Sequence, residues 1–131
     1  MKALLDTHIL LWWLAEDPRL SPEQRQVLDK ADATTPLWVA DITLWEIATL
    51  FSLGRIKLHL PLRDWLEQAT APPLVQRIPI MPAIAAEVAA FPDTFHRDPA
   101  DRIIVATARV LCATLMTRDR RIVEAGLVPT L

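Results

Sequence analysis

The pattern of apolar and polar positions predicts short buried strands that alternate with helices along the whole chain. Residues 2–5, 37–40 and 114–117 are short, largely apolar runs typical of buried strands, residues 75–80 alternate as in a strand, and 127–131 are expected to add a last one. Helical spacing, caps and breakers between them predict helices over 8–15, 22–32, 42–53, 62–70, 83–91 and 99–111. This alternation is typical of an α/β domain with a mostly parallel central sheet.

Local signals define several of these boundaries. Thr7 is the expected cap of the first helix, and Ser21-Pro22-Glu23-Gln24 is a capping box with proline at the first helical position. Gly54 is expected to end the helix over 42–53, and Pro79 restricts the run 75–80 to an edge strand or a strand end. No repeat, low-complexity segment or linker divides the sequence, so we expect a single domain over residues 1–131.

Composition excludes several classes of protein. Although 52% of the 131 residues are hydrophobic, no stretch reaches the roughly 18 apolar residues of a membrane span. Asp6 and His8 interrupt the first apolar run, which argues against a signal peptide, so we expect a cytoplasmic protein with no membrane contact. Cys112 is the only cysteine, which excludes an internal disulfide, and its apolar neighbours predict that it is buried.

The glycine count and the charge bear on nucleotide and nucleic-acid binding. With only Gly54 and Gly126, neither a P-loop nor a dinucleotide-binding glycine motif can be written. The formal net charge of −2 argues against broad binding of polyanions, but a nucleic-acid substrate remains open because arginines lie close to aspartates in the last third of the chain. Three of these arginines are candidates for holding phosphates, namely Arg97, Arg102 and Arg118.

Acidic residues follow the predicted strands at several places. Asp6 ends the first strand, Asp119 lies two residues past the run 114–117, and Asp98 and Asp101 begin the helix over 99–111. Ligands of parallel sheets bind at the carboxyl ends of the strands, so we expect these residues to converge on one rim. Glu46, in the largely apolar string TLWEIATL, is positioned to lean toward them.

Each of these residues also has a purely structural interpretation. Asp98 is a good N-cap, Asp101 complements the helix dipole, and Asp119 and Glu46 could pair with cations. Together, however, several carboxylates at one site repel one another unless a cation neutralises them. Oxygen ligands suit Mg²⁺ or Mn²⁺, and no His/Cys set has the spacing for zinc. Because such an ion can activate water and orient a phosphate, the residues predict phosphodiester hydrolysis.

Four ordered segments carry a family resemblance. LLDTHILLWWLAEDPRLS, DITLWEIATLFSLGRI, FHRDPADRIIVATA and LMTRD together resemble the PIN-domain ribonucleases, and among them the VapC-type toxins of toxin–antitoxin pairs. The resemblance implies a PIN-like α/β/α sandwich and an endoribonuclease that depends on Mg²⁺ or Mn²⁺. It also implies a set of site residues: Asp6, Glu46 and Asp119 as metal ligands, Asp101 as the third acidic ligand with Asp98 able to share or replace its role, and Thr117 orienting Asp119 or a metal-bound water.

The resemblance further implies partners. These are an RNA substrate, a second copy of the chain in a homodimer, and a cognate VapB-like antitoxin whose C-terminal segment covers the site. Trp12 or Trp45 could line the antitoxin groove.

Three other interpretations of the residues stay open. One is a catalytically inactive PIN scaffold that binds RNA or protein. A phospho-receiver domain would need an acidic partner beside Asp6, and a haloacid-dehalogenase-like phosphatase would need an aspartate where His8 stands.

Overall fold

The computed structural model describes residues 1–131 and contains a four-stranded sheet in the order β3-β2-β1-β4. Every neighbouring pair of strands is parallel, which confirms the predicted α/β class. The strands are short, and each lies within a segment predicted as a strand: β1 (Ala3–Leu5), β2 (Leu37–Ala40), β3 (Val75–Ile78) and β4 (Thr114–Met116). As Pro79 predicts, β3 is an edge strand and ends just before that residue.

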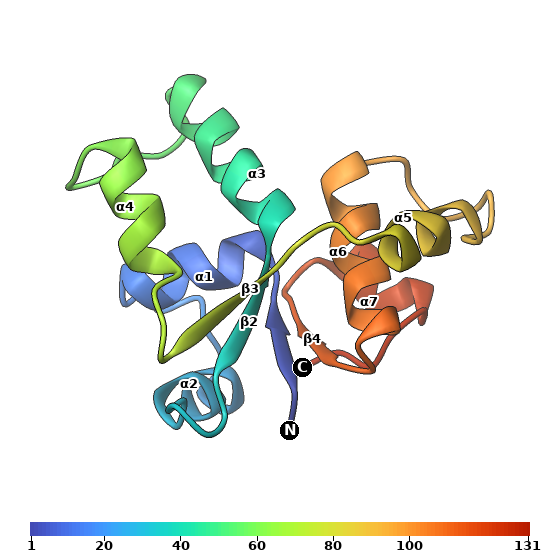
Figure 1. Ribbon diagram of the computed structural model, residues 1–131, viewed down its shortest axis with the longest axis horizontal. Helices are drawn as coiled ribbons and strands as arrows, with labels where there is room; N and C mark the ends of the chain where they lie inside the picture. Colours follow the sequence, from blue (N-terminus) through green and yellow to red (C-terminus); the bar gives the residue numbers. More distant parts are fainter.

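Helices cover both faces of the sheet, so the protein is an α/β/α sandwich (Figure 1). One layer contains α1 (Thr7–Leu14), α2 (Pro22–Asp29) and α4 (Leu62–Ala69). The other contains α5 (Pro82–Ala89), α6 (Pro99–Val110) and α7 (Arg120–Ala125). The longer helix α3 (Asp41–Ser52) leaves the end of β2 and contacts α1, α4 and α6, so it joins the two layers above the carboxyl ends of the strands (Figure 1).

The hydrophobic core consists of two clusters, one on each face of the sheet. Successive residues of a strand point to opposite faces, so Leu5 packs with Ile9 in the first cluster and Leu4 packs with Ile104 in the second. A strand buried on both faces requires a continuous apolar run. That requirement explains why β1 is entirely apolar and why the first charge after it, Asp6, stands at the sheet's rim.

Some predicted helix boundaries need correction. The cap of α1 is Asp6 rather than Thr7, because the Asp6 carboxylate accepts a hydrogen bond from the Thr7 backbone N–H and Thr7 is already helical. The capping box is present, with the Ser21 hydroxyl and the Gln24 side chain each 3.1 Å from the other residue's backbone nitrogen. That helix ends at Asp29 instead of residue 32.

Three further differences lie near the C-terminus. Residues 127–131 form no strand, only an isolated bridge between Leu115 and Thr130. Helix α7 was not predicted, because its six residues bury only Ile122. Cys112 is exposed rather than buried, at a turn where its φ is +53°. None of the helices combines the length and the apolar character that crossing a membrane requires.

Candidate active site

Five carboxylates from separate segments line one cavity of about 470 Å³ at the carboxyl ends of the strands: Asp6, Glu46, Asp98, Asp101 and Asp119. Asp6 follows β1, Asp119 lies shortly after β4, Glu46 projects from α3, and Asp98 and Asp101 begin α6. The geometry therefore brings together the acidic residues that the sequence singled out. Their separation along the chain is overcome by the parallel sheet, which puts the ends of β1 and β4 side by side.

Asp6 is the most buried of the five, with 6% of its surface exposed. Its Oδ1 accepts a hydrogen bond of 2.8 Å from the Thr7 N–H, and its Oδ2 accepts one of 2.7 Å from the Thr117 hydroxyl. Burial raises the pKa of Asp6, although both hydrogen bonds act against that rise, and the nearby charge of Asp119 adds to it. A carboxylate in this position favours a cation beside it.

Thr117 links Asp6 to Asp119. Its hydroxyl donates to Asp6 and accepts a 3.0 Å hydrogen bond from the Asp119 backbone N–H. Asp119 caps α7, and its carboxylate accepts hydrogen bonds from the backbone and the guanidinium of Arg121. Burial alone would raise the pKa of Asp119, but the hydrogen bonds and charge of Arg121, together with the charge of His96, lower it.

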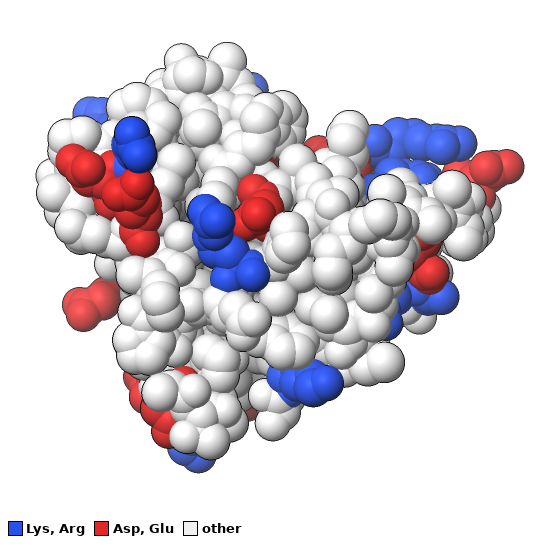
Figure 2. Space-filling model, in the orientation of Figure 1, with Lys and Arg blue, Asp and Glu red and all other residues white.

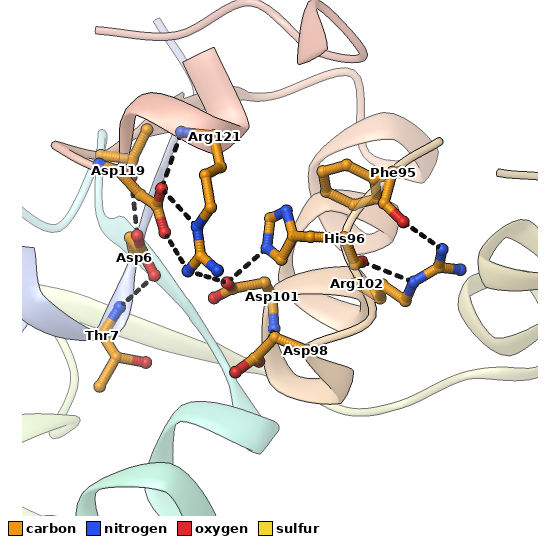
Figure 3. A network of polar contacts seen from close by, with 10 residues as sticks. Asp6, Thr7, Phe95, His96, Asp98, Asp101, Arg102, Asp119 and Arg121 are labelled. Atoms are coloured by element: carbon orange, nitrogen blue, oxygen red, sulfur yellow. Dashed lines mark hydrogen bonds and ion pairs between the residues drawn. The ribbon is translucent and has the colours of Figure 1, made fainter. Parts of the chain in front are cut away.

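Asp101 lies at the centre of the acidic cluster. Its Oδ2 is 2.7 Å from Nε2 of His96 and 3.6 Å from Nη2 of Arg121, so the guanidinium lies between Asp101 and Asp119 (Figure 3). Burial raises the pKa of Asp101, the hydrogen bond from His96 opposes this, and the charges of Asp6, Asp98 and Asp119 raise it further. Sequence reasoning placed neither His96 nor Arg121 at the site. The only signal was that both lie within five residues of a predicted site aspartate.

Asp98 and Glu46 complete the cluster from two helices. Asp98 is exposed and caps α6, its Oδ1 accepting a 3.0 Å hydrogen bond from the Asp101 N–H, so its predicted structural role is present. Glu46 is half-buried, and burial raises its pKa, as do the charges of Asp6, Asp101 and Asp98. Oxygens of Glu46, Asp98 and Asp101 lie within 4.8 Å of one another.

The donor set fits a hard divalent cation. Glu46, Asp98 and Asp101 offer only carboxylate oxygens, which are the ligands that Mg²⁺ and Mn²⁺ prefer. A second close group combines His96, Asp101 and Asp119, but Arg121 already places a positive charge between its two carboxylates. Asp101 belongs to both groups. The acidic cluster could therefore hold a metal ion, with Asp101 as its central member.

The predicted phosphate-binding arginines have different surroundings. Arg102 is buried and points away from the carboxylates, donating hydrogen bonds of 2.9 and 2.8 Å to the backbone carbonyls of His96 and Phe95 (Figure 3). It therefore holds the loop before α6 and is not available to a phosphate. Arg97 is exposed and lies 3.6 Å from Asp93, whereas Arg118 lines the cavity without a carboxylate partner.

Charge on the surface is local rather than broad. On the face shown in Figure 2, lysine, arginine and acidic side chains form small separate patches with uncharged surface between them. This agrees with the small net charge of −2. Patches of mixed sign do not add up to a large field of one sign on this face.

The parallel sheet, its two helical layers and the carboxylates at the strand ends define an α/β/α domain with an acidic centre, and comparisons with known proteins give the family. Residues 3–127 match the family model described as PIN domain. Ribonuclease VapC22 of Mycobacterium tuberculosis (strain ATCC 25618 / H37Rv) is 42% identical over 119 residues, which cover 91% of this chain and 88% of that protein. The chain belongs to the PIN domain family.

Solved structures agree with the fold. VapBC2 from Rickettsia felis, bound to a DNA fragment from its promoter, contains a chain that matches with a TM-score of 0.72 and 15% identity, covering 100% of this chain and 98% of that one. VapBC-1 from nontypeable Haemophilus influenzae matches with a TM-score of 0.71 and 18% identity, covering 100% and 97%. The predicted family and the PIN-like fold are both confirmed, and the phospho-receiver and phosphatase interpretations are set aside.

Proposed function

We propose that this chain is a divalent-metal-dependent endoribonuclease that acts as the toxin of a toxin–antitoxin pair. The single observation that carries the proposal is the convergence of five carboxylates from distant segments in one cavity. The extensive similarity to a protein named as a ribonuclease gives independent support for RNA as the substrate.

Asp6, Glu46, Asp101 and Asp119 are the proposed metal ligands. Asp98 is an exposed auxiliary carboxylate in reach of Glu46 and Asp101. Bound Mg²⁺ or Mn²⁺ would lower the pKa of an attacking water and would offset the negative charge that develops on the phosphate. Oxygen-only ligands agree with either ion.

The other residues of the site position these carboxylates. The Thr117 hydroxyl fixes one oxygen of Asp6 and, through the Asp119 N–H, the start of α7. His96 holds Oδ2 of Asp101, and Arg121 offsets the charge of Asp101 and Asp119. None of the residues lining the cavity carries a hydroxyl or a thiol, so no serine, threonine or cysteine is placed to act as the nucleophile, and water is the proposed nucleophile.

The proposed partners follow from the same family. A further solved structure that matches this fold is named as a toxin–antitoxin complex from Klebsiella pneumoniae, which supports a cognate VapB-like antitoxin for this chain. Homodimerisation is proposed as well, and large apolar side chains are available on the surface, among them Trp45, which is 58% exposed. Trp12 lines the acidic cavity and is the better placed of the two tryptophans to meet a segment that covers it.

The decisive experiment replaces Asp6. Purified wild-type protein and Asp6→Asn are incubated with RNA and Mg²⁺ or Mn²⁺, and we expect cleavage by the wild type only. Expression of the wild type should arrest growth, and the same substitution should relieve the arrest. Equal cleavage by the two proteins would show that Asp6 does not take part in the reaction.

An inactive scaffold is the competing interpretation, and it makes a different prediction for metal binding. A functional carboxylate site should be stabilised by Mn²⁺, by about 2.7 kcal/mol when the free ion is at 100 times its Kd. Thermal unfolding with Mn²⁺ and with EDTA measures this directly. A melting temperature that is the same under both conditions would favour a scaffold without a metal centre.

A further inference from the structure

A second cavity adjoins the acidic one and has the opposite charge. It has a volume of about 390 Å³, within the rough range of 300–1,000 Å³ that ligand sites occupy, and lies between α1 and the connection from α3 to α4. Four residues line both cavities, namely His8, Trp12, Arg19 and Arg55. We call this second cavity the basic cleft. The shared residues form the boundary between the two cavities, so the basic cleft opens beside the carboxylates.

The basic cleft has an excess of positive charge. Its only carboxylate, Asp17, is neutralised by Arg19, whose Nη2 lies 2.8 Å from Oδ2 and whose Nε lies 3.1 Å from Oδ1. Arg55 and Lys57 are exposed, and their side chains make no ion pair and no hydrogen bond. Arg55 and Lys57 are therefore two unpaired cations beside a cavity with five carboxylates. They can bind an anion, such as a phosphate, that the carboxylates repel.

Aromatic rings line the same cleft. Trp12 is half-buried, with the Arg19 guanidinium 4.6 Å from its ring centre and the exposed His8 ring 5.9 Å away. His8 is also shared with the acidic cavity. Cations that contact the backbone, combined with aromatic faces that stack on bases, are the elements by which proteins bind unpaired nucleic acid.

We infer that the basic cleft is a nucleotide subsite that holds RNA next to the bond to be cleaved. Arg55 and Lys57 bind the phosphate of that neighbouring nucleotide, and its base lies against His8 and the exposed part of Trp12. The inference rests on the proposed function and extends it to a binding subsite beside the acidic cavity. Because a base that contacts His8 must be outside a base-paired stack, the subsite takes an unpaired nucleotide.

The first test measures the phosphate contacts by fluorescence anisotropy with a fluorescein-labelled single-stranded oligoribonucleotide and Mg²⁺, in the non-cleaving Asp6→Asn background. Arg55→Gln/Lys57→Gln should lower affinity at least tenfold. It should also flatten the dependence of log K on log salt by about 0.7, since both side chains contact one phosphate and each phosphate contact to a single strand contributes about 0.7. The matched control, Lys30→Gln/Arg77→Gln, removes one lysine and one arginine that line neither cavity and should change affinity less than twofold.

The second test measures the base contact. His8→Ala should weaken single-stranded binding several-fold and leave binding of the same sequence in a duplex unchanged, and His8→Phe should restore the single-stranded affinity because it keeps the ring. Binding of Arg55→Gln/Lys57→Gln equal to the control overturns the inference. So does a loss of antitoxin co-purification without any loss of RNA affinity, which would assign the cleft to a protein segment.

The two proposals can fail separately. If the wild type cleaves RNA but the cleft variants bind it normally, the ribonuclease proposal stands and the subsite is wrong. If the wild type never cleaves RNA but the cleft variants lose affinity as expected, the cleft binds RNA and the proposed catalytic function is wrong.

Discussion

Replacing Thr117 by valine tests how the site supports its buried charge. The Thr117 hydroxyl is a hydrogen-bond donor to Asp6 Oδ2 at 2.7 Å and the acceptor for the Asp119 N–H at 3.0 Å. Both Thr117 and Asp6 are buried, with 3% and 6% of their surfaces exposed, so water cannot readily replace the lost group. Valine keeps the shape of the side chain and removes only the hydroxyl.

The size of the effect follows from the charge of Asp6. A hydrogen bond to an ionised group contributes about 1.5–3 kcal/mol, whereas a neutral pair contributes about 0.5–1.5 kcal/mol. We therefore expect Thr117→Val to lower the free energy of unfolding of the metal-free protein by about 2–3 kcal/mol near neutral pH. The substitution also removes an interaction that lowers the pKa of Asp6, so that pKa should rise further.

The pH dependence has a definite sign. The pKa of Asp6 is raised in the folded protein above the value of 3.8 that it has when unfolded, as are those of Asp101 and Glu46 above 3.8 and 4.5. Between the unfolded and folded values the folded protein binds more protons, so stability falls as pH rises through that window. Asp119 has a lowered pKa and acts oppositely, losing its contribution as pH falls below 3.8. With EDTA, the wild type should therefore be less stable at neutral pH than slightly above pH 4.

The assay is urea unfolding followed by tryptophan fluorescence in EDTA, near pH 4.5 and near pH 7.5. The loss caused by Thr117→Val should be larger at the higher pH, where Asp6 is more fully ionised. Thr117→Ser keeps the hydroxyl and serves as the control. An equal loss at both pH values, or an equal loss in the serine variant, would refute the account of Thr117 as a partner of a charged Asp6.

Other substitutions separate roles within the cluster. Asp101→Asn should abolish stabilisation by Mn²⁺ in thermal unfolding, whereas Asp98→Asn should retain most of it, because Asp98 is exposed and asparagine also caps helices. Arg121→Gln removes the cation between two carboxylates and should raise the affinity for Mn²⁺ several-fold in calorimetric titration; an unchanged affinity would argue against competition between the guanidinium and the metal. Arg102→Met should lower the free energy of unfolding by about 3 kcal/mol and leave RNA affinity of the folded protein unchanged, since its partners are the buried carbonyls of Phe95 and His96.

The main features of the fold were predictable because they depend on simple periodicity. Short apolar runs, and one alternating segment, correctly predicted every strand of the sheet. A parallel sheet then implied that Asp6 and Asp119, which follow two of these strands, line the same cavity. What the pattern could not give was the order of strands, since the pairing of β1 with β4 depends on packing across the whole chain. Helix α7 could not be predicted, because a six-residue helix with one buried residue has no helical periodicity of apolar positions.

The interaction partners of individual side chains were less predictable than the location of the site residues in the fold. Arg102 was a candidate for holding phosphate because it lies next to Asp101, but its partners are backbone carbonyls, which no sequence motif reveals. In the sequence, Arg121 is one of several arginines near Asp119. The turn at the start of α7 places its guanidinium beside Asp101, which the sequence does not reveal. Asp and Thr are both favourable N-cap residues, so the sequence alone could not show whether Asp6 or Thr7 caps α1.

The pairing of the first strand with the last has a consequence for synthesis on the ribosome. Asp6 emerges early, yet the hydroxyl that holds it belongs to a residue 111 positions later, and Asp119 emerges later still. A growing polypeptide that stops before Thr114 contains most of the helices but lacks β4, the neighbour of β1 on that side of the sheet. The carboxylate cluster is therefore complete, and Asp6 held in place, only after the last strand and the residues that follow it have been synthesised.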